Sequence, residues 1–402
     1  SLAWIISNEQ FMKGAKALNS LKLRVGYGVT GNQDAITAYN SLQVMTPNGI
    51  TTYNGIPTVT YATSSNSNPD LKWETKSTFD VGLDFAFFKS RLSGTIDYYM
   101  SRTKDMLYTY KVPVPPFVYT TLLANMGEMT NNGVELSIRG DVVRTKDWTL
   151  NLSANAAYQE NKLISLHGTY MGQELSTSKY VVLATGTAGG LTSNTGVTYM
   201  TEGKPVGIFR LPVHDGFDVD EQGHKHYRVK DLNNDGKIDL SDEGDREELG
   251  QAMPKVTANL TISLRFRDFD LTSQLQGAFG HKVYNFTNMC LNDLSGFPMY
   301  NVLQSAVDAN IYGLSHTSYY LENGDYVNIG YITLGYNLPD KVVRNSKIKG
   351  FRVALSCNNV ATITGYKGLT PMINSASISG GVDARNVFPI MRTFALQLNL
   401  KF

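Results

Sequence analysis

The stretch Thr78-Phe79-Asp80-Val81-Gly82-Leu83-Asp84-Phe85-Ala86-Phe87 decides the fold class of this protein. Large apolar residues occupy the odd-numbered positions from 79 to 87, and polar or small residues occupy the even-numbered positions. Successive side chains of a β-strand point to opposite faces of its sheet. The alternation therefore predicts a strand with one apolar face and one polar or small face.

The same period-two alternation recurs along most of the chain, whereas helical periodicity is scarce. The repeats lie at residues 92–98, 134–139, 148–155, 260–266, 269–279, 332–338, 351–355 and 394–402. Many of these runs, with their flanks, approach about ten residues, the length that a tilted strand needs to cross a bilayer. The strands of soluble sandwiches are shorter, usually about five or six residues. We count ten complete strands, and the tail of an eleventh at Trp4–Ile6.

Short and long connections alternate between the predicted strands. The short ones are 88–91, 140–146 and 267–268, with a somewhat longer one at 339–350, and the long ones are 31–72, 111–127, 161–254, 282–323 and 361–391. Outer-membrane barrels have short periplasmic turns and long outer loops. We therefore predict that residues 1–402 are the C-terminal part of one transmembrane antiparallel β-barrel domain, with Phe402 on the periplasmic side.

Composition supports this class. The net charge is +1, which gives no reason to expect a nucleic-acid partner, and only 18% of the residues are charged. The 23 tyrosines, 17 phenylalanines and 36 glycines suit a barrel with aromatic girdles and kinked strands. The chain contains no run of eighteen apolar residues, so the sequence predicts no membrane-spanning helix. The start, Ser1–Ile6, lacks the features of a signal peptide, so we expect an internal fragment.

Charged and amide side chains occupy the polar faces of the predicted strands. They are Asp80, Asp84, Asp97, Glu135, Arg139 and Gln274. Such groups are costly to expose to lipid, so we expect them to face a wet or plug-filled lumen. A barrel cannot leave a strand edge open in lipid, because the backbone groups of that edge would stay unpaired. We therefore expect further strands upstream of this chain. The two cysteines, Cys290 and Cys357, form no motif and are predicted to be unpaired thiols.

Several segments, in order along the chain, resemble the C-terminal part of the SusC/RagA-like TonB-dependent transporters of Bacteroidetes. They are Leu21-Lys22-Leu23-Arg24-Val25-Gly26-Tyr27-Gly28 with Thr30-Gly31-Asn32, Asn68-Pro69-Asp70-Leu71-Lys72-Trp73-Glu74, Asp97-Tyr98-Tyr99, Asn131-Asn132-Gly133-Val134-Glu135-Leu136, Thr333-Leu334-Gly335-Tyr336-Asn337-Leu338-Pro339, and Asn358-Asn359-Val360 with Thr364-Gly365-Tyr366. The terminal Phe402 is similar to the recognition signal for barrel assembly.

The resemblance implies a barrel of about 22 strands around a plug, of which this chain is about the C-terminal half. It implies TonB-driven import of oligosaccharides or peptides across the outer membrane, beneath a SusD-like surface lipoprotein lid. In such a transporter this chain contacts outer-membrane lipid and supplies lumen wall and outer loops. The plug and the TonB-contacting region are absent from the chain, so energy coupling rests on the resemblance alone.

The sharpest local motif is a loop of the EF-hand type. It runs Asp231-Leu232-Asn233-Asn234-Asp235-Gly236-Lys237-Ile238-Asp239-Leu240-Ser241-Asp242. The predicted ligands are Asp231, Asn233, Asp235, the backbone carbonyl of Lys237, Asp239 and Asp242, and the glycine supplies the sharp turn. Hard oxygen ligands suit calcium, so we expect a structural calcium ion in the longest outer loop. The alternative is a metal-free polar turn.

The remaining candidates are weaker. His224 and His226 would share one face of an extended strand, either as a two-point metal site or as ordinary exposed histidines. The outer loops are rich in aromatic side chains suited to stacking on sugars or gripping peptides, or to simple packing: Tyr53, Tyr61, Phe117, Tyr119, Tyr170, Tyr180, Tyr199, Tyr300, Tyr319 and Tyr320. No catalytic motif stands in the chain, so an enzyme is not expected. The alternative to an importer is an adhesin or surface scaffold without active transport.

Overall fold

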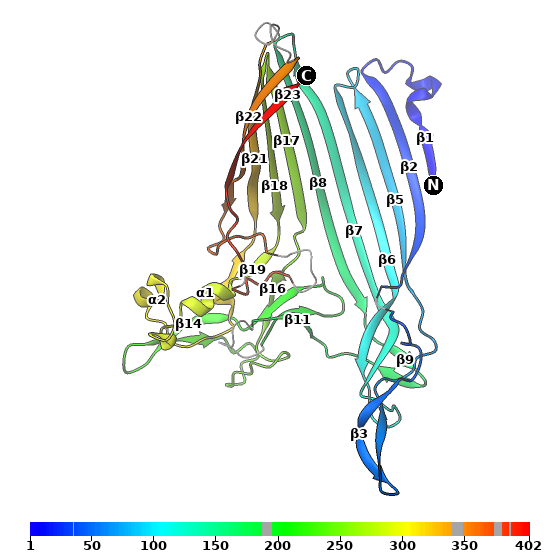
Figure 1. Cartoon of the computed structure of the whole chain (residues 1–402), viewed down its shortest axis with the longest axis vertical. Helices are drawn as coiled ribbons and strands as arrows, with labels where there is room; N and C mark the ends of the chain where they lie inside the picture. The colour runs from blue at the N-terminus through cyan, green and yellow to red at the C-terminus, as the bar shows by residue number, and fades with distance from the viewer. Residues whose placement is uncertain (35, 187–194, 340–348, 374–379, 386) are drawn as a thin grey trace.

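The computed structural model describes residues 1–34, 36–186, 195–339, 349–373, 380–385 and 387–402. Its main feature is an eleven-stranded antiparallel sheet whose strands follow one another in chain order (Figure 1). The strands are β1 (Leu2–Ile5), β2 (Leu18–Asn32), β5 (Glu74–Phe87), β6 (Leu92–Lys111), β7 (Thr121–Arg144), β8 (Trp148–Ser165), β17 (Val256–Phe266), β18 (Phe269–Phe279), β21 (Tyr326–Asn337), β22 (Gly350–Thr364) and β23 (Thr393–Lys401). The predicted all-β antiparallel architecture is confirmed, and the sheet is open between β1 and β23.

The register of the sheet gathers the predicted polar residues on one face. Asp97 of β6 lies opposite Glu135 of β7, and Thr261 of β17 lies opposite Gln274 of β18. Following the ladder from strand to strand places all six predicted lumen residues on that face. Because a shift of one residue would exchange the two faces of a strand, the unbroken pairing of β17 with both neighbours fixes this arrangement.

Ion pairs cross the polar face, both between neighbouring strands and between strands separated by one other strand. The Arg24 guanidinium on β2 donates to Asp84 on β5 at 3.0 Å and to Asp97 on β6 at 2.7 Å. Farther along the sheet, Arg352 on β22 donates to Asp270 on β18 at 2.5 Å. Pairing and hydrogen bonding lower the free-energy cost of placing these charges on a half-buried surface. The polar face is therefore a cross-linked wall.

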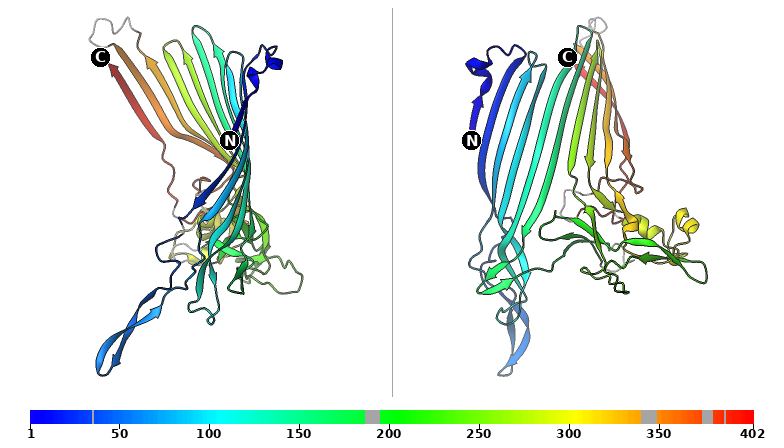
Figure 2. Two further views of the ribbon diagram at one scale, coloured as in Figure 1. Left: turned by 90° about the vertical axis from the view of Figure 1, so that its right-hand side faces the viewer. Right: turned by 180° about the vertical axis from the view of Figure 1, so that it is seen from behind.

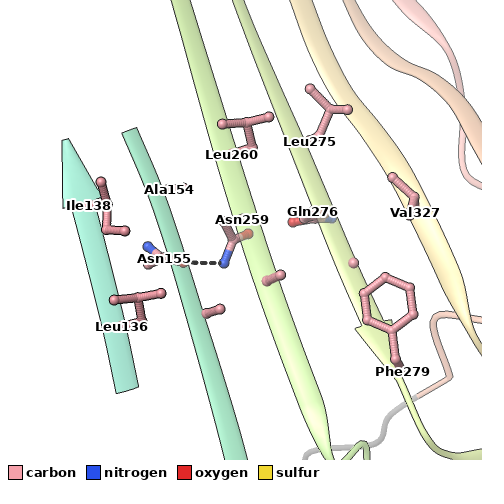
Figure 3. A pocket seen from close by; sticks show the side chains of 13 residues that line it. Leu136, Ile138, Ala154, Asn155, Asn259, Leu260, Leu275, Gln276, Phe279 and Val327 are labelled. Carbon is pink, nitrogen blue, oxygen red and sulfur yellow. Dashed lines mark hydrogen bonds between the residues drawn. The ribbon is translucent and has the colours of Figure 1, made fainter. Parts of the chain in front are cut away.

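The opposite face is apolar. Where β7, β8, β17 and β18 run side by side, this face has a hollow of about 340 Å³. Figure 3 shows the larger side chains at its margin, namely Leu136, Ile138, Leu260, Leu275, Val327 and Phe279. Its floor is formed by small residues, including Ala156 and Ala258. An apolar face of this extent suits contact with lipid hydrocarbon.

The connections sort by length between the two ends of the sheet. The turns 88–91, 145–147 and 267–268 lie at the end that also holds the C-terminus (Figures 1 and 2). The connections 112–120 and 280–325, and the described parts of 33–73, 166–255 and 365–392, lie at the other end. The described connections agree with the predicted alternation of short and long, and Phe402 lies at the short-turn end, whereas the predicted connection 339–350 lies mostly outside the described residues. The strands β7, β8 and β22 extend farther into the predicted loops than we expected.

The long connections carry structure that the sequence pattern did not indicate. They contain β3 (Met45–Tyr53), β4 (Ile56–Thr63), β9 (Gly168–Tyr170), β10 (Gln173–Leu175), β11 (Val181–Thr185), β12 (Gly196–Met200), β13 (Ile208–Leu211), β14 (His214–Val219), β15 (Lys225–Val229), β16 (Glu247–Gln251), β19 (Lys282–Tyr284), β20 (Leu321–Asn323), α1 (Phe286–Leu291), α2 (Gln304–Ala309) and the 3₁₀ turns η3 (Leu294–Gly296) and η4 (Ser318–Tyr320). Two further 3₁₀ turns, η1 (Ile6–Asn8) and η2 (Gln10–Met12), lie between β1 and β2. Most strands here are too short to show alternation. Among the described residues, no helix is long and apolar enough to cross a membrane.

The main fully buried cores lie in these connections and in the outer ends of the strands that lead into them. One core joins Val197, Phe209, Leu211, Tyr284, Phe286, Met289 and Tyr320. A second joins Tyr110, Leu122, Ala124, Tyr170 and Leu175 where β6 and β7 extend beyond the rest of the sheet. Burial of these side chains stabilises the outer segments as folded units, because each fully buried large apolar side chain contributes about 1.5–3 kcal/mol. Cys290 is part of the first core, and both cysteines are free thiols as predicted.

Candidate functional site

The candidate calcium loop belongs to the folded unit between β8 and β17. The four strands β11, β12, β13 and β16 form one sheet of this unit, and the loop leads directly into β16. The loop is thus attached to a buried core on one side and open to solvent on the other. Its conformation is set by hydrogen bonds of its own side chains.

The first half of the loop has the sharp turn that the motif predicted. The Asp231 carboxylate accepts the backbone N–H groups of Asn234, at 2.7 Å, and of Gly236, at 2.8 Å. The carboxylate of Asp235 accepts the N–H of Lys237 at 2.8 Å. Gly236 has a φ of +81°, a left-handed conformation that glycine adopts without strain. These contacts hold oxygen-bearing side chains around a tight reversal of the chain, and Asn233 joins them by donating to Asp235.

The second half of the loop is directed toward protein groups. Asp239 accepts the N–H and the hydroxyl of Ser241. One oxygen of Asp242 accepts the Tyr199 hydroxyl at 2.6 Å and lies 3.6 Å from the Arg246 guanidinium. Burial and the Asp242 hydrogen bond together raise the pKa of the Tyr199 hydroxyl, which therefore stays protonated as a donor. Asp242 thus ties the end of the loop to the sheet beneath it.

Asp245 is a key residue that the sequence motif did not identify. It is 3% exposed, and its carboxylate accepts the N–H groups of Asp239 at 2.8 Å and of Leu232 at 2.9 Å. These backbone hydrogen bonds, that of Asp239 foremost, hold the pKa of the Asp245 carboxyl below its ordinary value. The loop is therefore closed on an internal carboxylate that lies three residues beyond the motif.

The fit of this loop to calcium is partial. The turn and the oxygen donors of its first half suit a hard cation, whereas Asp242 has one oxygen committed to Tyr199. Across the part of the chain that the structure describes, no three His, Cys, Asp or Glu side chains are grouped so that they could hold a metal ion. Calcium at this loop therefore stays a prediction.

The histidine pair lies on the neighbouring hairpin of β14 and β15. His224 Nδ1 and His226 Nε2 lie 3.0 and 3.1 Å from the same oxygen of Asp220. The His224 ring also stacks on Tyr312, with 3.6 Å between the ring centroids. Hydrogen bonds, that from His226 foremost, lower the pKa of the Asp220 carboxyl to about 2. The pair thus braces the hairpin through one carboxylate.

The aromatic residues of the outer segments divide into two groups. Tyr170, Tyr199 and Tyr320 are buried and belong to the packing of these segments. The others are exposed or half-buried: Tyr53, Tyr61, Phe117, Tyr119, Tyr180, Tyr300 and Tyr319. Of these, Tyr180 has a fixed position, because the Arg210 guanidinium carbon lies 4.1 Å from the centroid of its ring.

Comparison with known proteins identifies the same sheet in other chains. The family model described as "TonB dependent receptor-like, beta-barrel" matches residues 15–360. The TonB-dependent receptor SusC of Bacteroides thetaiotaomicron is 30% identical over the whole chain, and the TonB-dependent receptor P3 of Formosa agariphila is 27% identical over the whole chain. The chain spans only 39% and 41% of the lengths of these relatives.

Solved structures share the fold. The RagAB peptide importer in its open-open state superimposes over 100% of this chain and 42% of its own, with a TM-score of 0.80 at 24% identity. A further structure, of the RagAB peptide transporter, gives a TM-score of 0.74 at 24% identity. The open eleven-stranded sheet therefore corresponds to part of a larger barrel in these proteins.

Proposed function

The chain belongs to the family of TonB-dependent receptor-like β-barrels, and we propose that it forms part of the wall and outer segments of an outer-membrane importer. The observation that carries this proposal is the family match, which spans most of the sheet and the outer segments in chain order. Members of this family are outer-membrane transporters and not enzymes. The two-faced sheet supports the proposal, because one face suits lipid and the other suits an aqueous lumen.

In the proposed importer, the substrate is an oligosaccharide or a peptide. It enters from the end of the sheet that carries the long segments and passes along the polar face. A SusD-like lipoprotein covers the entrance, and TonB supplies energy through a part of the importer that lies outside this chain. The ion pairs of Arg24 and Arg352 keep the wall rigid while a plug moves beside it.

Energy-dependent uptake tests this function. A strain that lacks the full-length parent protein should lose uptake of one labelled oligosaccharide or peptide class, and the restored gene should recover it. An uncoupler should abolish the recovered uptake, because the outer membrane has no energy source of its own. Retention of a surface lipoprotein during purification is the expected companion result. Uptake that is indifferent to both the gene and the uncoupler would favour an adhesin or scaffold.

We also propose a structural calcium ion in the loop 231–242, held by Asp231, Asn233, Asp235, the Lys237 carbonyl, Asp239 and the free oxygen of Asp242. The geometry of the first half of the loop supports this proposal. In the ion-loaded state, the cation would offset the repulsion between the carboxylates and stiffen the loop.

Calcium removal should make the loop 231–245 more sensitive to proteolysis. Asp231→Asn keeps the shape of the side chain but removes a charge, and it should weaken calcium binding at least about tenfold, or about 1.4 kcal/mol. Terbium luminescence and limited proteolysis, each with and without a chelator, measure the two effects. Asp245→Asn is the contrasting variant, because it should loosen the loop equally with and without calcium. Identical cleavage of the unmodified protein in both conditions would exclude the ion.

A further inference from the structure

A polar groove lies where the outer end of β6 meets the unit that holds the calcium-type loop. Its largest part has a volume of about 810 Å³, and its walls are 108–111 of β6, 176–178, 180–182 and Ser241–Glu243. A second hollow of about 480 Å³ shares the wall 176–178, and a third of about 580 Å³ shares Val182, Ser241 and Asp242. Ligand pockets commonly measure about 300–1,000 Å³, so the groove has room for a chain-like ligand.

The shared wall presents polar groups that make no hydrogen bond to the described part of the chain. Ser176, Thr177 and Ser178 connect β10 to β11, and neither their backbone nor their hydroxyl groups make a hydrogen bond to any residue that the structure describes. Hydroxyl groups both donate and accept, so this wall can match a ligand rich in hydroxyls. Thr109 and Ser241 add further hydroxyls on the other walls.

Tyr180 supplies an aromatic ring at the edge of the groove. The Arg210 guanidinium stacks on the ring, and Arg210 is itself fixed by the backbone carbonyls of Asp242, at 3.0 Å, and Gly244, at 3.1 Å. The edge of Tyr199 packs against the same ring, with 6.1 Å between the centroids. The ammonium group of Lys179 lies 5.2 Å from the ring centroid, on an exposed side chain. The ring is thus held in place while part of it still lines the groove.

The charges of the groove argue against an acidic ligand and against an apolar one. Asp242 and Glu243 line the largest part, and Glu174 and Glu202 line the second, against the two lysines Lys111 and Lys179. Carboxylates accept hydrogen bonds from pairs of neighbouring hydroxyls, and an aromatic ring packs on the apolar face of a sugar ring. A peptide would need apolar pockets for its side chains, and the largest part of this groove is lined mainly by polar atoms.

We propose that this groove binds a neutral oligosaccharide during import, with a sugar ring stacked on Tyr180 and its hydroxyls bonded to the wall 176–178 and to Glu243. This inference rests on the proposed function, and it selects the substrate class that the importer takes. A peptide is the competing ligand, and its binding is an outcome of the test.

Calorimetric titration of the purified full-length transporter tests the proposal. The ligands are linear neutral glucan and mannan oligosaccharides, an acidic uronate oligosaccharide and a defined peptide library. One neutral oligosaccharide should bind, and its affinity should be nearly independent of salt because no ion pair forms. Tyr180→Ala should weaken this binding about tenfold, and the double variant Thr177→Val with Ser178→Ala should weaken it to a similar degree. Tyr61→Ala, which removes an exposed tyrosine outside the groove, should leave it unchanged.

Three results would overturn the proposal: binding of none of the neutral oligosaccharides, unchanged affinity in both groove variants, or salt-sensitive peptide binding that the same variants weaken. Uptake in cells is measured separately. Energy-dependent uptake combined with unaffected groove variants would reject this site and keep the importer. Loss of energy dependence would reject the importer, whatever the groove binds. A melting curve for each variant shows whether the outer segments remain folded.

Discussion

Replacement of Leu260 by arginine is expected to destabilise the transporter by about 2–4 kcal/mol, the cost of an arginine near the middle of the lipid-facing surface of a barrel. Leu260 lies near the middle of β17, between Ala154 of β8 and Leu275 of β18, on the apolar face. Neither of these two register partners carries an acidic group, so the guanidinium would enter hydrocarbon without a partner. Urea unfolding of the full-length protein in lipid vesicles measures the effect.

The adjacent residue provides a matched control. Thr261 belongs to the polar face and lies opposite Ser153 and Gln274. Thr261→Arg places the same side chain one residue away but in a wet environment, so it should change the free energy of unfolding by less than about 1 kcal/mol. Equal effects of the two substitutions, or a larger effect at Thr261, would show that the faces are assigned the wrong way round.

Asn66→Ala is expected to unfold the connection between β6 and β7 locally, at a cost of about 2–4 kcal/mol. Asn66 is 8% exposed and bridges this connection to the segment before β5. Its amide group donates to the carbonyls of Tyr119, at 2.6 Å, and Thr121, at 2.8 Å. Its carbonyl oxygen accepts the N–H groups of Val118, at 3.0 Å, and Tyr119, at 3.1 Å. The alanine variant would leave all four backbone contacts without their partner.

Hydrogen exchange over residues 112–120 measures this loss of protection. Ser64→Ala is the matched control, because the Ser64 hydroxyl donates to the Val44 carbonyl at 3.1 Å, away from the backbone groups that Asn66 bonds. It should leave exchange at 112–120 unchanged. Normal protection in the Asn66 variant would mean that the connection is held by packing, for example through Phe117, rather than by the amide.

Contacts in the same region explain the role of the segment Asn68–Glu74, one of the segments that resemble the SusC/RagA-like transporters. The Asn68 amide donates to the carbonyl of Leu123, and its side-chain oxygen accepts the N–H of Asp70. A few residues later, Glu74 accepts the N–H of Leu107 on β6. These contacts fasten the start of β5 to β6 and β7. The motif is therefore a brace that positions an outer segment, and its role could not be read from the residues themselves.

The sequence alone determined the sheet and its two faces. Alternation such as that of Phe79, Val81 and Leu83 is a local property, because the direction of each side chain depends only on its place in the strand. Short turns such as 267–268 could also be predicted from the sequence, because only a tight turn can join two strands across so few residues. The assignment of polar and apolar residues to the two faces of the sheet could therefore be made for each strand without knowing which strands pair with it.

Only the tertiary structure decided how the outer segments are built. Their strands are too short to show a period, and their cores join residues as distant in sequence as Val197 and Tyr320. The commitment of Asp242 to Tyr199, the closure of the calcium-type loop on Asp245 and the groove beside Tyr180 all depend on contacts across sequence separations that no local pattern encodes. In a strand, every second side chain has the same environment, so the sequence shows a repeating pattern. A contact between two loops occurs only once, so its position is known only from the folded structure.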